Sequence, residues 1–125
     1  MTRALLLENP HDVADDIFAK FGIEVRRIKG ALSEDDLIEA LEGMDYLGLR
    51  SKTEVTERVL RARPELKAIG AFCIGTNQID LATATEMGIA VFNAPYSNTR
   101  SVVELAIGEI IDLSRRVTVK NSRLH

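Results

Sequence analysis

The chain has 125 residues, of which 46% are hydrophobic and 28% charged, and its formal net charge is −3 at pH 7. A chain of this length can form one ordinary domain and bury roughly two thirds of its unfolded surface. The slightly acidic balance gives no global electrostatic reason to bind nucleic acid or an anionic membrane, because such partners need clustered Lys and Arg.

The chain contains a single cysteine, Cys73, which leaves no partner for an intramolecular disulfide. It begins without the basic segment and long apolar run of a secretion signal. No apolar stretch approaches the ~20 residues of a membrane span. We therefore predict a reduced, cytoplasmic protein without nucleic-acid or membrane partners.

Short apolar runs alternate with amphipathic segments along the chain, which is typical of βαβ units around a parallel sheet. Each run is long enough for a strand and too short for a helix that stands alone. The pattern predicts an α/β fold with a doubly wound sheet of five parallel strands, buried on both faces. The predicted strands are residues 4–7, 23–28, 46–49, 68–74 and 90–93.

Side chains suited to capping helices precede four segments between these strands, because a Ser, Thr or Asp oxygen can accept from the first N–H groups of a helix. They are Asp12, Ser33, Thr56 and Asp80. Ser33 also opens a sequence that resembles a capping box. We expect helices over residues 57–62 and 81–87, with Pro64 just beyond the first of these. Three glycines are predicted to end helices: Gly22, Gly43 and Gly88.

Residues 101–116 are predicted to form the longest helix. Its apolar face is broader than a helix over one sheet usually needs, so we expect it to pack against something else as well. The residues that create this face are Val103, Ile107, Ile110, Ile111 and Leu113. Residues 117–125 are polar and without a clear period, as a linker or a truncation would be.

In a doubly wound sheet, ligands bind outside the carboxyl ends of the strands. The loop after the third strand reads Arg50-Ser51-Lys52-Thr53 and offers a guanidinium, an ammonium and two hydroxyls. Phosphate favours that set of donors, because charged N–H groups make its strongest hydrogen bonds. The alternative is that Arg50 and Lys52 are solvated loop charges.

Gly75 follows the fourth strand and can supply a tight turn whose neighbouring N–H groups, from Cys73 and Ile74, point outward. A plain strand-to-helix turn explains it equally well. Residues 70–75 have the glycine spacing of a phosphate loop, but Thr76-Asn77 follows where Lys-Ser or Lys-Thr is required. The chain contains no G-x-G-x-x-G, so the dinucleotide fingerprint is absent too.

The other candidates favour structural roles. Cys73 is interpreted as a small buried hydrophobe rather than a nucleophile, and His11 as a solvated loop residue. Asn98 can cap the last helix or donate its amide to a ligand, and Arg100 is interpreted as a surface charge. The two histidines and one cysteine have no metal-ligand spacing. No complete catalytic constellation is found.

Residues 30–32, 48–53, 68–80 and 91–105 together resemble the D-3-phosphoglycerate dehydrogenases, within the D-isomer-specific 2-hydroxyacid dehydrogenase family. The resemblance extends over residues 5–115, and the sequence from Phe72 to Gln78 is most similar to the bacterial form. It implies a flavodoxin-like substrate-binding domain, of which residues 1–116 form part. Residues 117–125 would be a truncated linker toward an absent Rossmann domain for NAD.

By the same resemblance, Arg50, Ser51 and Lys52 contact the substrate phosphate or adjacent oxygens. The N–H groups around Cys73, Ile74 and Gly75 hold the carboxylate, and Asn98 reaches into the cleft. Family members often have arginine in place of Lys52, and a lysine keeps the charge but loses the fork. The family's catalytic arginine, glutamate and histidine lie downstream of residue 125.

The resemblance thus implies an enzyme that oxidises 3-phosphoglycerate to 3-phosphohydroxypyruvate with NAD in serine synthesis, commonly with a serine-sensing domain. We predict that the fragment alone is inactive and binds no cofactor or metal. The full-length form is predicted to be a homo-oligomer, and the fragment to self-associate through its last helix. Two alternatives remain: another D-2-hydroxyacid dehydrogenase, or a non-catalytic module that binds an anionic metabolite.

Overall fold

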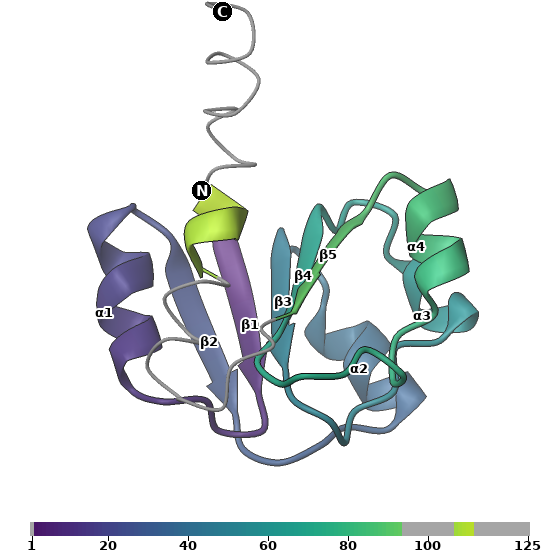
Figure 1. Cartoon of the computed structure of the whole chain (residues 1–125), viewed down its shortest axis with the longest axis horizontal. Coiled ribbons are helices and arrows are strands. Elements are labelled where there is room, and N and C mark those ends of the chain that lie inside the picture. Colours follow the sequence, from purple (N-terminus) through teal and green to yellow (C-terminus); the bar gives the residue numbers. More distant parts are fainter. Residues whose placement is uncertain (1, 94–106, 112–125) are drawn as a thin grey trace, which may run out of the picture.

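A computed structural model describes residues 2–93 and 107–111, and it shows a five-stranded, all-parallel sheet with helices on both faces (Figure 1). The strand order is β2-β1-β3-β4-β5, which is the flavodoxin-like topology that the family resemblance implied. The strands are β1 (Arg3–Leu7), β2 (Glu24–Ile28), β3 (Tyr46–Leu49), β4 (Ala68–Ala71) and β5 (Ala90–Asn93).

Four helices connect the strands, and three of the four predicted caps are confirmed. They are α1 (Val13–Lys20), α2 (Glu34–Ala40), α3 (Glu57–Ala62) and α4 (Leu81–Glu86). Ser33, Thr56 and Asp80 each accept a hydrogen bond from the N–H group three residues later. Asp12 holds the N-cap position of α1 but makes no side-chain capping bond. His11 caps this helix instead, because its Nδ1 accepts from the N–H of Val13 at 3.1 Å.

The predicted helix ends at Gly22, Gly43 and Gly88 are confirmed by their backbone conformation. Their φ angles are 71°, 75° and 74°, in the left-handed region that glycine adopts without steric cost. The chain therefore reverses into β2, β3 and β5 at short, defined distances after α1, α2 and α4.

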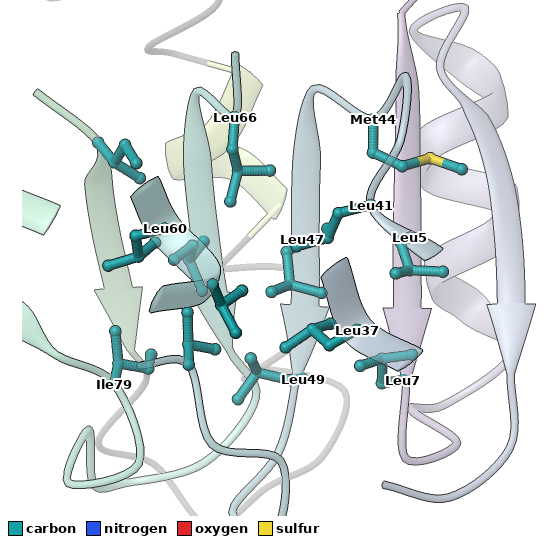
Figure 2. Packing of buried hydrophobic residues seen from close by; sticks show 14 of the residues in the cluster. Leu5, Leu7, Leu37, Leu41, Met44, Leu47, Leu49, Leu60, Leu66 and Ile79 are labelled. Atoms are coloured by element: carbon teal, nitrogen blue, oxygen red, sulfur yellow. The ribbon is translucent and has the colours of Figure 1, made fainter. Parts of the chain in front are cut away.

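The larger core lies on the face of the sheet covered by α2, α3 and α4. Figure 2 shows Leu37 of α2 and Leu41, which follows the last residue of α2, lying over the leucines of β1 and β3. Leu5, Leu47 and Ile69 are fully buried there, and each large aliphatic side chain of this kind contributes about 1.5–3 kcal/mol to the stability of the fold. This packing fixes the strand ends that carry the polar loops.

A second core lies on the opposite face, under α1 and the helical residues 107–111. In Figure 1 α1 lies on the left of the sheet and α2, α3 and α4 on its right. Ile107 and Ile110 are 0% and 1% exposed and pack with Leu6 and Phe72. Two of the residues from which self-association was predicted are therefore buried against their own sheet. Leu113 and most of the predicted long helix lie outside the described residues.

The expectation that all five strands are buried on both faces is wrong for the two edges of the sheet. β1, β3 and β4 are almost continuously buried, whereas every residue of β2 and β5 is partly or fully exposed. An edge strand has a neighbour on one side only, and β2 carries two arginines that need solvent or partners. Arg27 forms a salt bridge with Asp15 of α1, at 2.8 Å.

β4 also ends three residues earlier than predicted. Its last pair with β3 is Ala71 with Leu49, and β3 ends at Leu49. After the Phe72 N–H, which donates to the carbonyl of Leu49 at 2.8 Å, the described chain continues as a bend and no longer pairs with β3. Ile74, expected inside the strand, is 63% exposed.

Candidate functional site

A depression of about 420 Å³ lies at the carboxyl ends of β1, β2 and β3. Its lining comes from the three loops that follow these strands: Glu8, Asn9, Gly30, Ala31, Arg50, Ser51 and Lys52. β1 and β3 are neighbours in the sheet, and the connections that leave them, through α1 and α3, lie on opposite faces. The depression therefore lies at the topological switch point, where doubly wound folds bind their ligands.

The carboxylate of Glu8 joins the first of these loops to the third. Its Oε2 accepts from the N–H groups of Arg50 and Thr53, both at 3.1 Å, and its Oε1 accepts from the N–H of Lys52 at 2.8 Å. Its own N–H donates to the carbonyl of Gly30 at 3.2 Å, which adds the loop after β2. Glu8 is only 8% exposed, so the three loop ends form one hydrogen-bonded unit.

The charge of Glu8 is stabilised within this unit. Burial raises the pKa of a carboxyl, but the N–H donors of Lys52, Thr53 and Arg50 outweigh it and lower the pKa of Glu8 below its ordinary value of 4.5. The side chain is therefore ionised at neutral pH. Its negative charge is compensated by donors on the protein and needs no counter-ion from a ligand.

Arg50 and Lys52 are the cations of the depression, and both are exposed. Neither forms a salt bridge within residues 2–93 and 107–111, whereas Arg27, Arg58 and Arg61 are paired with carboxylates. The N–H of Ser51 likewise has no hydrogen-bond partner in the described part of the chain. Two free cations, a hydroxyl and a free N–H group can together bind an anion.

The loop after β4 lies beside this unit and does not line the depression. Gln78 connects the two, because its Nε2 donates to the carbonyl of Arg50 at 2.7 Å. A parallel bridge between Val55 and Ile79 adds to the connection. The structure therefore brings Arg50, Ser51 and Lys52 into one depression and holds Cys73, Ile74 and Gly75 in the adjacent loop.

Cys73 is half-buried, which corrects its interpretation as a buried hydrophobe. Its thiol donates to the carbonyl of Gly75 at 3.1 Å, and the side-chain amide of Gln78 lies 3.4 Å from its sulfur. Asn93, at the end of β5, donates to the carbonyl of Ile74 at 2.6 Å. The N–H groups of residues 73–75 have no partner within the structure as described, so they are available to a ligand.

Two sequence-predicted residues cannot be placed: Asn98 and Arg100 lie outside the described residues. Glu8 is the residue that sequence reasoning missed. The signal was a charged residue directly after a buried apolar strand, but nothing in the sequence indicates that its side chain is turned toward a loop 42 residues away.

Among the described residues, no group of three His, Cys, Asp or Glu side chains is arranged to hold a metal ion. Within the same residues, no helix has the length and apolar character needed to cross a bilayer.

Comparison with known proteins places the chain in a family. Residues 4–121 match the family described as D-isomer specific 2-hydroxyacid dehydrogenase, catalytic domain. The chain is 50% identical over 121 residues to D-3-phosphoglycerate dehydrogenase 2 of Saccharomyces cerevisiae, covering 97% of this chain and 26% of the relative. It is 48% identical over 122 residues to D-3-phosphoglycerate dehydrogenase of Escherichia coli, with 97% and 30% covered.

Solved structures show the same fold. The NAD-bound 3-phosphoglycerate dehydrogenase of Entamoeba histolytica superposes with a TM-score of 0.68 and 26% identity, covering 90% of this chain and 39% of that one. The TT0316 protein of Thermus thermophilus gives 0.71 and 25%, with 97% and 39% covered. The chain thus spans between 26% and 30% of the length of these two curated relatives.

Proposed function

The chain belongs to the D-isomer specific 2-hydroxyacid dehydrogenase family, and we propose that it is part of the substrate-binding domain of a D-3-phosphoglycerate dehydrogenase. The observation that carries this proposal is the pair of exposed cations, Arg50 and Lys52, which lack salt bridges within the described chain and line the depression at the switch point. The relatives from yeast and E. coli, at 50% and 48% identity, bear this name.

In this proposal the phosphate of 3-phosphoglycerate lies against Arg50, Ser51 and Lys52. Arg50 supplies a planar fork that can hold two phosphate oxygens, Lys52 a point charge, and Ser51 its hydroxyl and N–H group. A dianionic phosphate gains from both cations, because neither is paired with a carboxylate among residues 2–93 and 107–111.

The carboxylate end of the substrate is assigned to the loop after β4. The N–H groups of Cys73, Ile74 and Gly75 have no partner among the described residues, and they are suited to a second anion, since a carboxylate can accept two or three backbone N–H bonds. Asn98 would complete the cleft. Gln78 keeps this loop against the phosphate loop, so the phosphate and carboxylate ends of one small acid can be held at once.

The proposed reaction of the whole enzyme oxidises the C2 hydroxyl of 3-phosphoglycerate to the ketone of 3-phosphohydroxypyruvate, as a step toward serine. Held elsewhere in the enzyme, NAD would accept the C2 hydride, and a base would take the hydroxyl proton. The 125 residues contain no G-x-G-x-x-G, so NAD and the base are assigned to parts of the enzyme outside this chain. Residues 1–116 then orient the substrate, residues 117–125 lead toward the NAD domain, and the chain alone is inactive.

Titration of the isotope-labelled chain by NMR tests this proposal. With 3-phosphoglycerate, amide shifts are expected in residues 50–52 and 73–75, at millimolar concentrations because only part of the full site is present. D-glycerate, which lacks the phosphate, should leave residues 50–52 unshifted. Equal shifts there with both ligands would favour another D-2-hydroxyacid dehydrogenase, and no shifts with either would contradict the site.

A matched pair of variants sharpens the titration. Arg50→Ala should abolish the shifts that 3-phosphoglycerate causes in residues 51 and 52, whereas Arg26→Ala should not. Arg26 is an exposed arginine on β2 without a salt bridge in the described structure, and it does not line this depression. Both variants remove one positive charge, so a difference between them measures local contact rather than the overall charge of the chain.

The proposed assembly is a cytoplasmic homo-oligomer in the full-length form. For the chain alone, self-association now rests on Ile111, which is partly buried, and on Leu113. Light scattering over a concentration series checks it, and a constant monomeric mass at high concentration would contradict it.

A further inference from the structure

The segment from Arg50 to Thr53 directs most of its backbone donors to the carboxylate of Glu8, which itself lines the depression. Of its four N–H groups, those of Arg50, Lys52 and Thr53 donate to the carboxylate of Glu8. Ser51 retains the only N–H of this segment that is free within the described structure. This segment is therefore not a backbone cradle for an anion, because its cradle is already filled by a protein carboxylate.

We infer that Glu8 is a positioning residue for the anion site. By occupying the three inner N–H groups, it holds the segment so that the side chains of Arg50 and Lys52 and the N–H of Ser51 meet the ligand. The inference rests on the proposed function, since it concerns how that phosphate is recognised.

The backbone around Glu8 supports this role. Glu8 and Asn9 have φ angles of 64° and 53°, a left-handed conformation that residues other than glycine rarely adopt. Such a conformation persists where surrounding contacts determine it, and it is concentrated at functional sites. Here the contacts are the three bonds to the carboxylate and the bond from the N–H of Glu8 to Gly30.

Thr53 extends the unit to the loop after β2. It is 0% exposed, its N–H donates to Glu8, and its Oγ1 accepts from the N–H of Leu32 at 3.4 Å. The segment is thus anchored at its far end, and Glu8 determines the course of the residues between this anchor and β3.

Neutralising Glu8 changes the affinity for phosphate in opposite directions, depending on whether Glu8 acts only through its charge or positions the segment. A carboxylate at the edge of an anion site repels the ligand, so if Glu8 had no positioning role, the neutral Glu8→Gln variant would bind phosphate more tightly. If Glu8 positions the segment, the variant binds more weakly, because a glutamine amide has one acceptor oxygen and cannot accept the three N–H bonds that the two carboxylate oxygens of Glu8 accept. The direction of the change in Kd therefore distinguishes the electrostatic explanation from the positioning role.

The test compares the chain with Glu8→Gln and a control variant, Asp45→Asn. Asp45 is also a carboxylate that accepts a backbone N–H, that of Arg3 at 3.0 Å, but it precedes β3 at the opposite end of the strand. Titration with 3-phosphoglycerate should show Kd raised at least tenfold in Glu8→Gln and unchanged in Asp45→Asn. An equal or lower Kd in Glu8→Gln overturns the inference.

Amide hydrogen exchange of the unsubstituted, ligand-free chain adds a test that does not depend on a variant folding. The amides of Arg50, Lys52 and Thr53 should exchange at least tenfold more slowly than that of Ser51, relative to their intrinsic rates. Equal rates in all four overturn the inference even if the ligand binds. If the unsubstituted chain binds neither 3-phosphoglycerate nor inorganic phosphate while the slow exchange is seen, the proposed function fails and the inference falls with it.

Discussion

The side-chain amide of Gln78 donates a 2.7 Å hydrogen bond to the backbone carbonyl of Arg50. This bond joins the loop after β4 to the segment that carries Arg50 and Lys52. The same amide lies 3.4 Å from the sulfur of Cys73, so one side chain contacts both loops assigned to the substrate. The spacing between the phosphate end and the carboxylate end of the proposed site therefore depends on Gln78.

Replacing Gln78 with leucine should weaken the connection between the two loops. Leucine keeps much of the side-chain volume but cannot donate, so the unfolding free energy should fall by about 1 kcal/mol, the typical net value of one hydrogen bond. Urea denaturation measures this change. Compared with the unsubstituted chain, the amide NMR signals of both loops should shift in Gln78→Leu. Asn77→Ala is the control, because Asn77 is exposed and its side chain makes no hydrogen bond in the described structure. Equal losses in the two variants would contradict the assigned role of Gln78.

Gly48 should not tolerate a side chain. A Cβ at this position would lie 2.5 Å from Cδ2 of Leu6 and 2.8 Å from Cε2 of Phe72, and both side chains are buried in the second core. Gly48→Ala should therefore cost about 1–3 kcal/mol, as overpacked cores do.

The comparison for Gly48 is Gly108→Ala, in the helical residues 107–111. A Cβ there meets nothing within 4 Å, and alanine in a helix is favoured over glycine by roughly 0.5–1 kcal/mol. In thermal or urea unfolding, Gly48→Ala should thus lower the unfolding free energy and Gly108→Ala should raise it. A neutral Gly48→Ala would show that Leu6 and Phe72 repack freely.

Periodicity and capping chemistry predict much of this fold because both are local. Residues 46–49 and 90–93 form strands as expected, and Ser33 caps α2. The end of β4 was missed for a non-local reason: the run from Ala68 to Ile74 is continuously apolar, but its partner strand stops at Leu49. A sequence pattern cannot show where a neighbouring strand ends.

In the candidate site, too, the residues with local signals could be predicted and those that depend on distant contacts could not. Arg50, Ser51 and Lys52 could be proposed from the sequence because donors suited to phosphate follow a strand directly, and the structure places all three in one depression. Glu8 could not, since its partners are 42 to 45 residues away and its role depends on a left-handed backbone at a residue that is not glycine. The capping role of His11 was missed too, because histidine is an unusual N-terminal acceptor.

Glu8 should make the stability of the chain depend on pH in the acid range. Its pKa in the folded state lies below 4.5, since the backbone donors outweigh burial. A depressed carboxyl pKa contributes stability that is fully present above the unfolded pKa and is lost as the pH falls through the folded pKa. At neutral pH, Glu8→Gln should cost about 2–3 kcal/mol, because it leaves buried donors without a full acceptor.

Urea unfolding at several pH values checks this dependence. The stability difference between the chain and Glu8→Gln should be constant from pH 7 to about 5 and shrink below that. A difference that stays constant to the lowest pH at which the chain folds would show that the charge of Glu8 does not contribute. Asp45→Asn serves again as the comparison at the other end of the sheet.

Lys52→Arg should tighten phosphate binding without changing the charge of the site. An arginine fork can donate two parallel hydrogen bonds to phosphate, whereas the lysine ammonium acts as a point charge. We expect Kd for 3-phosphoglycerate to fall by up to about tenfold, which corresponds to ~1.4 kcal/mol, and the shifts caused by D-glycerate to stay the same. Lys29→Arg is the matched control, because Lys29 is exposed and does not line the depression. The same Kd in both variants would show that Lys52 does not contact the phosphate, and the phosphate end of the site would then rest on Arg50 and Ser51 alone.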